Sequence, residues 1–270
     1  MKRIILLFLM LVVSLSFVSA QSEDDFIKMA DEFMANNQLE EAVKVYDQAI
    51  QKYPNFIKAY GARGFAKEMQ GNNSGALADF TKTLELSPDN LVYLNERGHL
   101  YLALKNYPAA LQDFSRSIEI YKDSPMAYNN RGIANREMGN YQAALSDYNQ
   151  AIKLSDKDAR CFYNRGLTKR MLKDLPGAIA DYNQAILLDP EYDAAYKNRG
   201  LAKYLSGDFK GAIADYNKAL EFKPSDASTI YNRGLAKLAS QDRIGACADW
   251  RIAQGMNYST ASDALKQYCQ

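Results

Sequence analysis

Arginine and aspartate recur in this 270-residue chain at a spacing that could support a series of ion pairs. A guanidinium and a carboxylate can form two parallel, charge-assisted hydrogen bonds. Six arginines lie 34 residues apart, and an aspartate follows each of them by 16 residues. The pairs are Arg63 and Asp79, Arg97 and Asp113, Arg131 and Asp147, Arg165 and Asp181, Arg199 and Asp215, and Arg233 and Asp249.

Side chains that perform acid–base catalysis or bind metals are scarce. His99 is the only histidine, and no cysteine or second histidine lies near it at a spacing typical of a metal site. No glycine-rich phosphate-binding loop occurs, and paired carboxylates such as Glu40 and Glu41 are typical of a solvated helix surface. The sequence therefore predicts a protein that is not an enzyme and that has no metal and no cofactor.

The ion-pair spacing belongs to a longer pattern. Small residues also recur every 34 residues, at Ala30, Gly64, Gly98, Gly132, Gly166, Gly200 and Gly234. A fixed period of this length indicates tandem repeats. Seven units fill residues 23–260 without a gap, at 23–56, 57–90, 91–124, 125–158, 159–192, 193–226 and 227–260. We number positions 1 to 34 in each unit, so the arginines are at position 7 and the aspartates at position 23.

Each unit is predicted to form two amphipathic helices joined by a tight turn. Position 20 is alanine and position 24 is aromatic in all seven units. Small residues at positions 8 and 20 let the two helices approach closely, and the aromatic ring fills the adjoining space. Asparagine or aspartate at position 16 of the last six units can cap the second helix, and proline at position 32 of four units ends it.

The period, the small residues at positions 8 and 20, the aromatic at position 24 and the proline at position 32 resemble the tetratricopeptide repeat family. The resemblance covers residues 23–260. It implies an all-α, right-handed superhelical solenoid whose first helices line a concave groove, and it implies binding of proteins or peptides without catalysis. We also expect a C-terminal capping helix at 261–270, which would cover the apolar face of the last repeat.

The arginine at position 7 departs from the apolar residue that the family usually has there. The first unit has Met29 at position 7 and Val45 at position 23, so the two positions change together. This covariation predicts that positions 7 and 23 of the same unit are in contact. We expect the six pairs to fix the register of the helices; the alternative is a charged ladder that recognises a ligand.

Candidate ligand-binding side chains occupy positions 5, 6 and 9 in the fourth to seventh units. Position 6 is asparagine in all four, and its amide could pair with a peptide backbone beside an apolar residue at position 9. The alternative is that these residues only pack the repeats together. The candidates are Asn129, Asn130, Ile133, Tyr163, Asn164, Leu167, Lys197, Asn198, Leu201, Tyr231, Asn232 and Leu235.

The chain has three cysteines, Cys161, Cys247 and Cys269. Cys247 lies in the last unit at a position that is aliphatic in the others, and Cys269 ends the expected capping helix. We therefore expect a disulfide between Cys247 and Cys269, with Cys161 left over as the odd thiol. The alternative is that both are buried thiols that pack as small apolar residues.

Residues 1–20 differ from the repeats in composition. A basic start, an apolar run and the small residues Ser19 and Ala20 predict a secretory signal peptide that is cleaved after Ala20. The protein is therefore expected to be exported, into the periplasm of a bacterium or as a secreted protein. The alternative is that the segment is not cleaved and serves as a membrane anchor. No later segment is apolar enough to be expected to span a membrane.

The charges of the chain are balanced, with 33 lysines and arginines and 32 aspartates and glutamates. No nucleic-acid partner is expected, because a phosphate-binding surface needs clustered basic residues. The primary hypothesis is an exported, non-catalytic scaffold that binds a peptide or protein segment in the groove. The alternatives are an assembly component of an envelope complex and a protein that binds a cell-wall glycan or another polymer. The sequence indicates neither the partner nor an oligomeric state.

Overall fold

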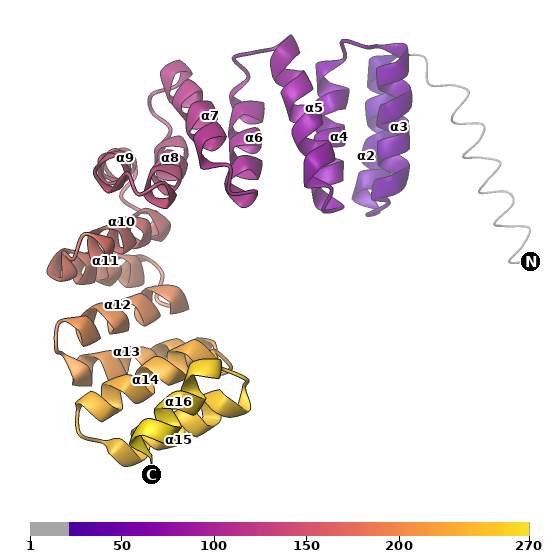
Figure 1. Ribbon diagram of the computed structural model, residues 1–270. Coiled ribbons are helices and arrows are strands. Elements are labelled where there is room, and N and C mark those ends of the chain that lie inside the picture. The colour runs from indigo at the N-terminus through magenta and orange to yellow at the C-terminus, as the bar shows by residue number, and fades with distance from the viewer. Residues whose placement is uncertain (1–21, 270) are drawn as a thin grey trace, which may run out of the picture. The chain divides into compact units, whose positions relative to one another are not determined.

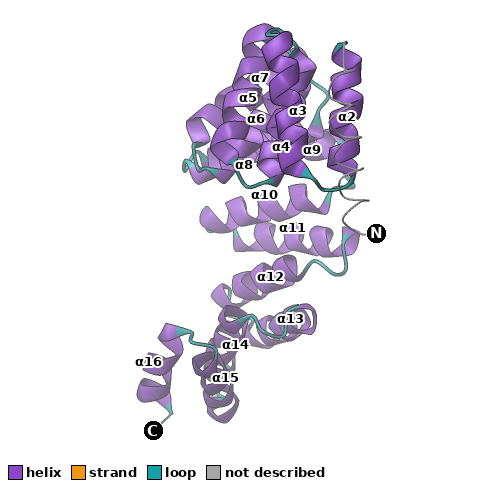
Figure 2. Ribbon diagram, turned by 90° about the vertical axis from the view of Figure 1, so that its right-hand side faces the viewer, coloured by secondary structure: helices purple, strands orange, loops and turns teal. Residues whose placement is uncertain are grey.

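The computed structural model of the protein describes residues 22–269. These residues form fifteen helices and no strand (Figures 1 and 2). The all-α repeat fold expected from the sequence is therefore confirmed. The predicted signal peptide, residues 1–20, lies outside the described residues.

The helices follow the predicted period, and each first helix begins at position 1 of its unit. The first helices are α2 (Glu23–Ala35), α4 (Ile57–Met69), α6 (Leu91–Ala103), α8 (Pro125–Glu137), α10 (Ala159–Met171), α12 (Asp193–Leu205) and α14 (Ala227–Ala239). The second helices are α3 (Leu39–Lys52), α5 (Asn73–Leu86), α7 (Tyr107–Ile120), α9 (Tyr141–Leu154), α11 (Leu175–Leu188), α13 (Phe209–Phe222) and α15 (Arg243–Gly255). The expected capping helix is α16 (Ser259–Tyr268), which begins two residues earlier than 261.

The chain divides between Lys122 and Asp123 into two compact lobes, each made of several repeats. The N-terminal lobe contains α2 to α7, and the C-terminal lobe contains α8 to α16. Within each lobe, every helix contacts the next one along the chain. In the C-terminal lobe the first helices of the repeats, α8, α10, α12 and α14, also contact one another in succession, so they form one continuous layer.

Glycine at position 8 allows the two helices of a repeat to pack closely. A Cβ atom on Gly200 would lie 2.9 Å from Cε1 of Tyr216, closer than real side chains approach. Tyr216 and Ala212, at positions 24 and 20, are fully buried in the same contact. The same arrangement recurs from the second repeat to the seventh, where Trp250 replaces the tyrosine or phenylalanine.

The helix ends are capped largely as the sequence predicts. The side chain of Asp208 accepts a hydrogen bond from the backbone N–H of Gly211 at 2.9 Å, and four equivalent residues cap their helices in the same way. Asn140 is the exception, because its side chain makes no capping hydrogen bond. At the start of α2, Ser22 and Asp25 form a capping box.

Candidate functional site

Six ion pairs join the first and second helices of the second to seventh repeats; we call this line of contact the seam. In the sixth repeat, Arg199 donates from Nε to Oδ2 of Asp215 at 2.9 Å and from Nη2 to Oδ1 at 2.6 Å. Asp215 is only 4% exposed. The other five pairs lie in the same place within their own repeats, which is the pairing that the covariation predicts.

Each seam arginine but one also binds the preceding repeat, which the sequence analysis did not anticipate. Nη1 of Arg199 donates to Oδ1 of Asn183, at position 25 of the fifth repeat, at 2.8 Å. Corresponding bonds are made by Arg63, Arg97, Arg165 and Arg233. In the sequence, the signal for these bonds was the polar side chain at position 25 of the preceding repeat. One guanidinium thus ties together three helices from two repeats.

Lysine at position 11 completes the seam in four repeats. Nζ of Lys203 lies 2.8 Å from Oδ2 of Asp215, and Lys67, Lys169 and Lys237 bind their own aspartates in the same way. The Arg199 guanidinium also lies 5.3 Å from the centre of the Tyr196 ring. Both oxygens of these aspartates therefore already have partners within the protein, as expected of a scaffold contact rather than of an open ligand site.

The twelve candidate binding residues lie on α8, α10, α12 and α14. We call the side chains at positions 5, 6, 9 and 12 of these four helices the first-helix face. At position 6, Asn130 and Asn164 are buried, at 5% and 9% exposure, and Asn129 beside them is 7% exposed. Asn198 and Asn232 are half-buried, as are Ile133, Leu167, Leu201, Leu235, Tyr163, Lys197 and Tyr231.

The buried asparagines bond to one another, both within α8 and between α8 and α10. Nδ2 of Asn164 donates to Oδ1 of Asn129 at 3.0 Å, which links α10 to α8. Asn129 in turn donates to Asn130 at 3.4 Å. The amides of these three buried asparagines thus already bond within the protein, which favours the alternative that they pack the repeats together. Peptide binding by the other candidates stays a prediction.

Position 5 carries the larger side chains of the face. The Tyr163 ring lies 4.9 Å from that of Tyr192, and its hydroxyl accepts a hydrogen bond from Nδ2 of Asn198 at 3.1 Å. Nζ of Lys197 lies 2.8 Å from Oδ2 of Asp226, which caps α14. Burial raises the pKa of Asp226, but hydrogen bonds from Lys197 and from the Ser228 and Thr229 hydroxyls outweigh burial and hold this pKa below its ordinary value.

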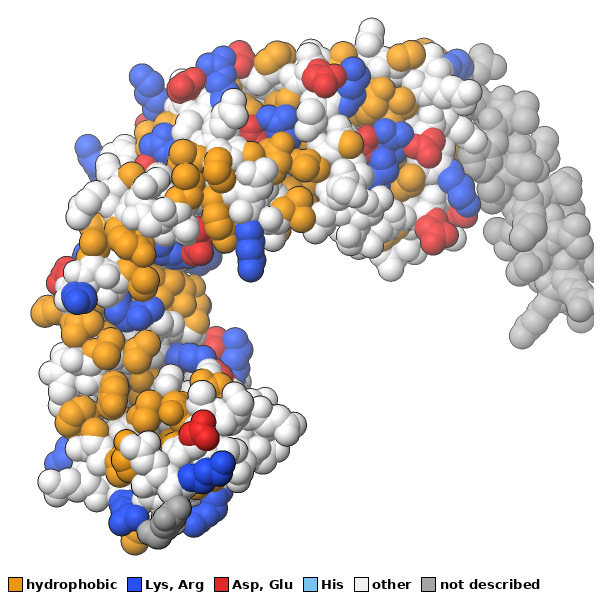
Figure 3. All heavy atoms as spheres, in the orientation of Figure 1, with side chains coloured by type: hydrophobic (Ala, Val, Ile, Leu, Met, Phe, Trp, Pro, Cys, Tyr) orange, Lys and Arg blue, Asp and Glu red, His pale blue; other side chains and the backbone are white. Residues whose placement is uncertain are grey.

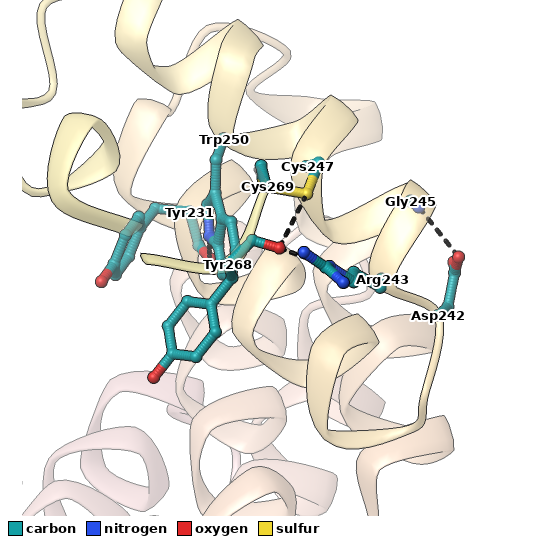
Figure 4. The surroundings of a disulfide bond; sticks show 8 residues. All are labelled: Tyr231, Asp242, Arg243, Gly245, Cys247, Trp250, Tyr268 and Cys269. Carbon is teal, nitrogen blue, oxygen red and sulfur yellow. Dashed lines mark hydrogen bonds between the residues drawn. A yellow bond between two sulfur atoms is a disulfide. The ribbon is translucent and has the colours of Figure 1, made fainter. Parts of the chain in front are cut away.

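Cys247 and Cys269 form a disulfide with a Cα–Cα distance of 5.8 Å (Figure 4). The bond attaches the end of α16 to α15. Nearby, the Tyr268 ring lies 5.7 Å from that of Trp250, whose indole N–H donates to the backbone carbonyl of Tyr231 at 3.2 Å. Ala261 and Ala264 of α16 are buried in the same contact, so α16 covers the last repeat.

The remaining candidates for chemistry are placed as follows. Cys161 is a free thiol, 1% exposed, and burial raises its pKa to about 12, so it is a poor nucleophile. His99 packs edge-on against Phe114, with ring centres 5.7 Å apart. Within residues 22–269, no group of three or more histidine, cysteine, aspartate or glutamate side chains is placed to hold a metal ion.

Positive and negative side chains are interspersed over the face drawn in Figure 3, and neither sign forms a continuous patch there. Across the described part of the chain, each helix is too short or too polar to cross a lipid bilayer.

Comparisons with known proteins agree with this arrangement. Family models described as tetratricopeptide repeat or TPR repeat match residues 89–157, 30–71, 169–207 and 200–241. A tetratricopeptide repeat protein from Parabacteroides merdae superimposes with a TM-score of 0.73 at 23% identity, covering 93% of this chain and 100% of its own. A search of curated proteins found no match.

Two further solved structures share the fold over part of the chain. MamA superimposes with a TM-score of 0.56 at 28% identity, covering 61% of this chain and 96% of its own. YrrB, described as a TPR protein with an unusual peptide-binding site, has a TM-score of 0.58 at 18% identity and covers 70% of this chain and 97% of its own. The repeats, their helix pairs and the matching family models together show that the chain belongs to the tetratricopeptide repeat family.

Proposed function

We propose that the protein is an exported, non-catalytic scaffold whose first-helix face binds an extended peptide segment of a partner protein. The observation that carries this proposal is the row of half-buried side chains on the first helices of four successive repeats. Tyrosine or lysine at position 5 lies beside leucine at position 9 in the fifth to seventh repeats. Such a surface offers apolar contact area and polar atoms together, as peptide-binding surfaces do.

The spacing of the helices suits an extended chain. Packed helices lie about 8–10 Å apart. An extended peptide advances about 3.3 Å per residue, so roughly three of its residues would span one repeat. A peptide lying across α8, α10, α12 and α14 could therefore present a side chain to Leu167, Leu201 and Leu235 in turn.

Membership of the tetratricopeptide repeat family supports a protein partner, because domains of this family bind proteins. The fold is shared with YrrB, whose description names a peptide-binding site. The predicted leader at residues 1–20 supports export, and the disulfide between Cys247 and Cys269 is of a kind that persists in oxidising compartments.

Selection of peptides from a random library tests the binding surface. The double variant Leu167→Glu with Leu201→Glu places two charges on the first-helix face and should lose binding of the selected peptides. The matched control is Leu187→Glu, because Leu187 lies on the second helix α11 and is 72% exposed. This control should bind as the unmodified protein does. Equal binding by the double variant would rule out the first-helix face as the binding surface.

N-terminal sequencing of the protein purified from its native cells tests export. We expect the mature chain to begin at Gln21 and to be found outside the cytoplasm. A chain that keeps Lys2 and Arg3 and fractionates with the cytoplasm would contradict this part of the proposal.

A further inference from the structure

Arg170, at position 12 of the fifth repeat, is the one basic side chain on α8, α10, α12 and α14 that forms no salt bridge within the described residues. Every other arginine and lysine on α8, α10, α12 and α14 forms a salt bridge with an aspartate or glutamate. Arg170 forms none with the residues that the structure describes. Its Nε atom is buried and has no hydrogen-bond acceptor there. The sequence analysis did not single out this residue.

No acidic side chain of these four helices is left to neutralise Arg170. Their only acids are Glu137 and Asp193. Oε1 of Glu137 lies 2.8 Å from Nη2 of Arg136, and Oδ2 of Asp193 lies 2.9 Å from Nζ of Lys223. A half-buried guanidinium without a counter-charge raises the free energy of the protein, so an anion bound beside it would be favourable.

Tyr163 lies two turns before Arg170 on the same helix, α10, and its ring centre is 6.0 Å from that of Tyr182 on α11. Burial raises the pKa of Tyr163, and the nearby Arg136 and Arg170 guanidinium groups partly offset that rise. Because the Tyr163 hydroxyl accepts a hydrogen bond from Asn198, its own proton is directed away from that amide. Tyr182 of α11 is fully buried, and its hydroxyl has no hydrogen-bond partner among the described residues. Burial raises its pKa as well, and Arg170 again acts in the opposite direction.

We call Arg170, Tyr163 and Tyr182 the donor-rich cluster, because it holds several N–H and O–H groups but no carboxylate. We propose that this cluster binds the carboxylate of an aspartate or glutamate side chain within the peptide that crosses the first-helix face. The inference rests on the proposed function. The outer nitrogens of Arg170 can form two parallel hydrogen bonds with a carboxylate, and the Tyr163 hydroxyl can donate a third. Tyr182, fully buried, packs against the Tyr163 ring with ring centres 6.0 Å apart.

The position of the cluster favours an internal side chain over the C-terminal carboxylate of a peptide. The first-helix face continues on both sides of Arg170, to Ile133 on α8 and to Leu201 on α12. A peptide can therefore run past Arg170 in both directions. Apolar peptide residues would then contact these two side chains, with the acidic residue between them.

The test uses immobilised random peptides with acetylated N-termini and amidated C-termini. The unmodified protein should select peptides with one aspartate or glutamate flanked by apolar residues. Changing that residue to its amide should weaken binding about tenfold or more, because hydrogen bonds to charged groups are the stronger kind. The variant Arg170→Gln should bind the acidic and amide peptides with nearly equal affinity. Arg170→Lys, which keeps the charge but loses the paired geometry, should fall between.

The matched control is Arg160→Gln. Arg160 lies on the same helix, carries the same charge and is paired with Asp158 at 2.8 Å. This variant should discriminate between the two peptides as strongly as the unmodified protein does. Circular dichroism of each variant shows whether the fold is kept.

The other outcomes separate this inference from the proposed function. Peptides that bind without any preference for an acidic residue, or a preference that survives in both Arg170 variants, would overturn the carboxylate site and leave peptide binding standing. If peptides with amidated C-termini fail to bind and the same peptides with a free C-terminus bind, the site for an internal carboxylate is also overturned. If the unmodified protein selects no peptides with either kind of C-terminus, both the carboxylate site and peptide binding are contradicted.

Discussion

Arg199 is bound at once to Asp215 of its own repeat and to Asn183 of the preceding one. The ion pair sets the register of α12 against α13, and the bond to Asn183 sets α12 against α11. Because Asp215 is 4% exposed, leaving its carboxylate without a cationic partner would be costly. The same relationship in other repeats makes the seam a device for joining neighbours rather than a set of isolated pairs.

The first prediction concerns the cost of losing a seam arginine. Asp113 is bound by Arg97, and position 11 of that repeat is Tyr101 rather than a lysine. The variant Arg97→Leu therefore leaves Asp113 buried without a cation and should lower the free energy of unfolding by about 3–5 kcal/mol. Arg199→Leu should cost less, because Lys203 still binds Asp215. Urea titration of the two variants measures the difference.

A double-mutant cycle provides the control. Arg97→Leu combined with Asp113→Val resembles the apolar pair Met29 and Val45 of the first repeat, so much of the lost stability should return. If the double variant is no more stable than Arg97→Leu alone, the cost does not arise from the uncompensated carboxylate.

The sequence predicted the repeats, the helix pairs and the six seam contacts because each depends on one repeating unit. Position 7 and position 23 change together, and that covariation was enough to place them side by side. The bond between Asn164 and Asn129 could not be found in this way, because it depends on the distance between helices of different repeats. Arg170 was missed for a related reason. Its lack of a counter-charge becomes visible only once the partners of Glu137 and Asp193 are known.

The second prediction concerns glycine at position 8. A Cβ atom on Gly200 would meet both the Tyr216 ring and the backbone oxygen of Ala212. Gly200→Ala should therefore lower the free energy of unfolding by about 1–3 kcal/mol. We expect the lower end of that range, because Ala30 occupies this position in the first repeat.

Gly255, at the end of α15, has no atom within 4 Å of the corresponding Cβ position. Gly255→Ala should accordingly leave stability unchanged or raise it slightly. Equal urea midpoints for the two alanine variants would show that the contact with Tyr216 does not require glycine.

The third prediction concerns a buried hydroxyl. Tyr216 is fully buried, and its hydroxyl has no hydrogen-bond partner among the described residues, while phenylalanine fills this position as Phe80 and Phe114. Tyr216→Phe should keep or raise the free energy of unfolding, by up to about 1 kcal/mol, because it removes an unpaired polar group.

Tyr46, at the same position of the first repeat, serves as the comparison. Burial, followed by the charge of the Asp31 carboxylate and hydrogen bonding to it, raises the pKa of Tyr46 to about 12. Tyr46→Phe should therefore destabilise the protein, by about 1 kcal/mol, through loss of that interaction. The explanation fails if thermal unfolding shows the reverse order of the two variants.

The last prediction concerns the disulfide that attaches α16 to α15 (Figure 4). Cys247 and Cys269 are 22 residues apart, and opening a loop of that length should lower the free energy of unfolding by about 3 kcal/mol. Because the contact of Tyr268 with Trp250 also holds α16, we expect reduction of the disulfide to loosen α16 without unfolding the whole last repeat. Hydrogen exchange should therefore quicken in α16 after reduction, more than in α12.

The control is Cys247→Ser with Cys269→Ser, which should match the reduced protein and should not respond to a reductant. If reduction lowers the stability of this variant too, the effect does not come from the disulfide. If it changes neither protein, the contacts of α16 with the last repeat are sufficient to hold the cap.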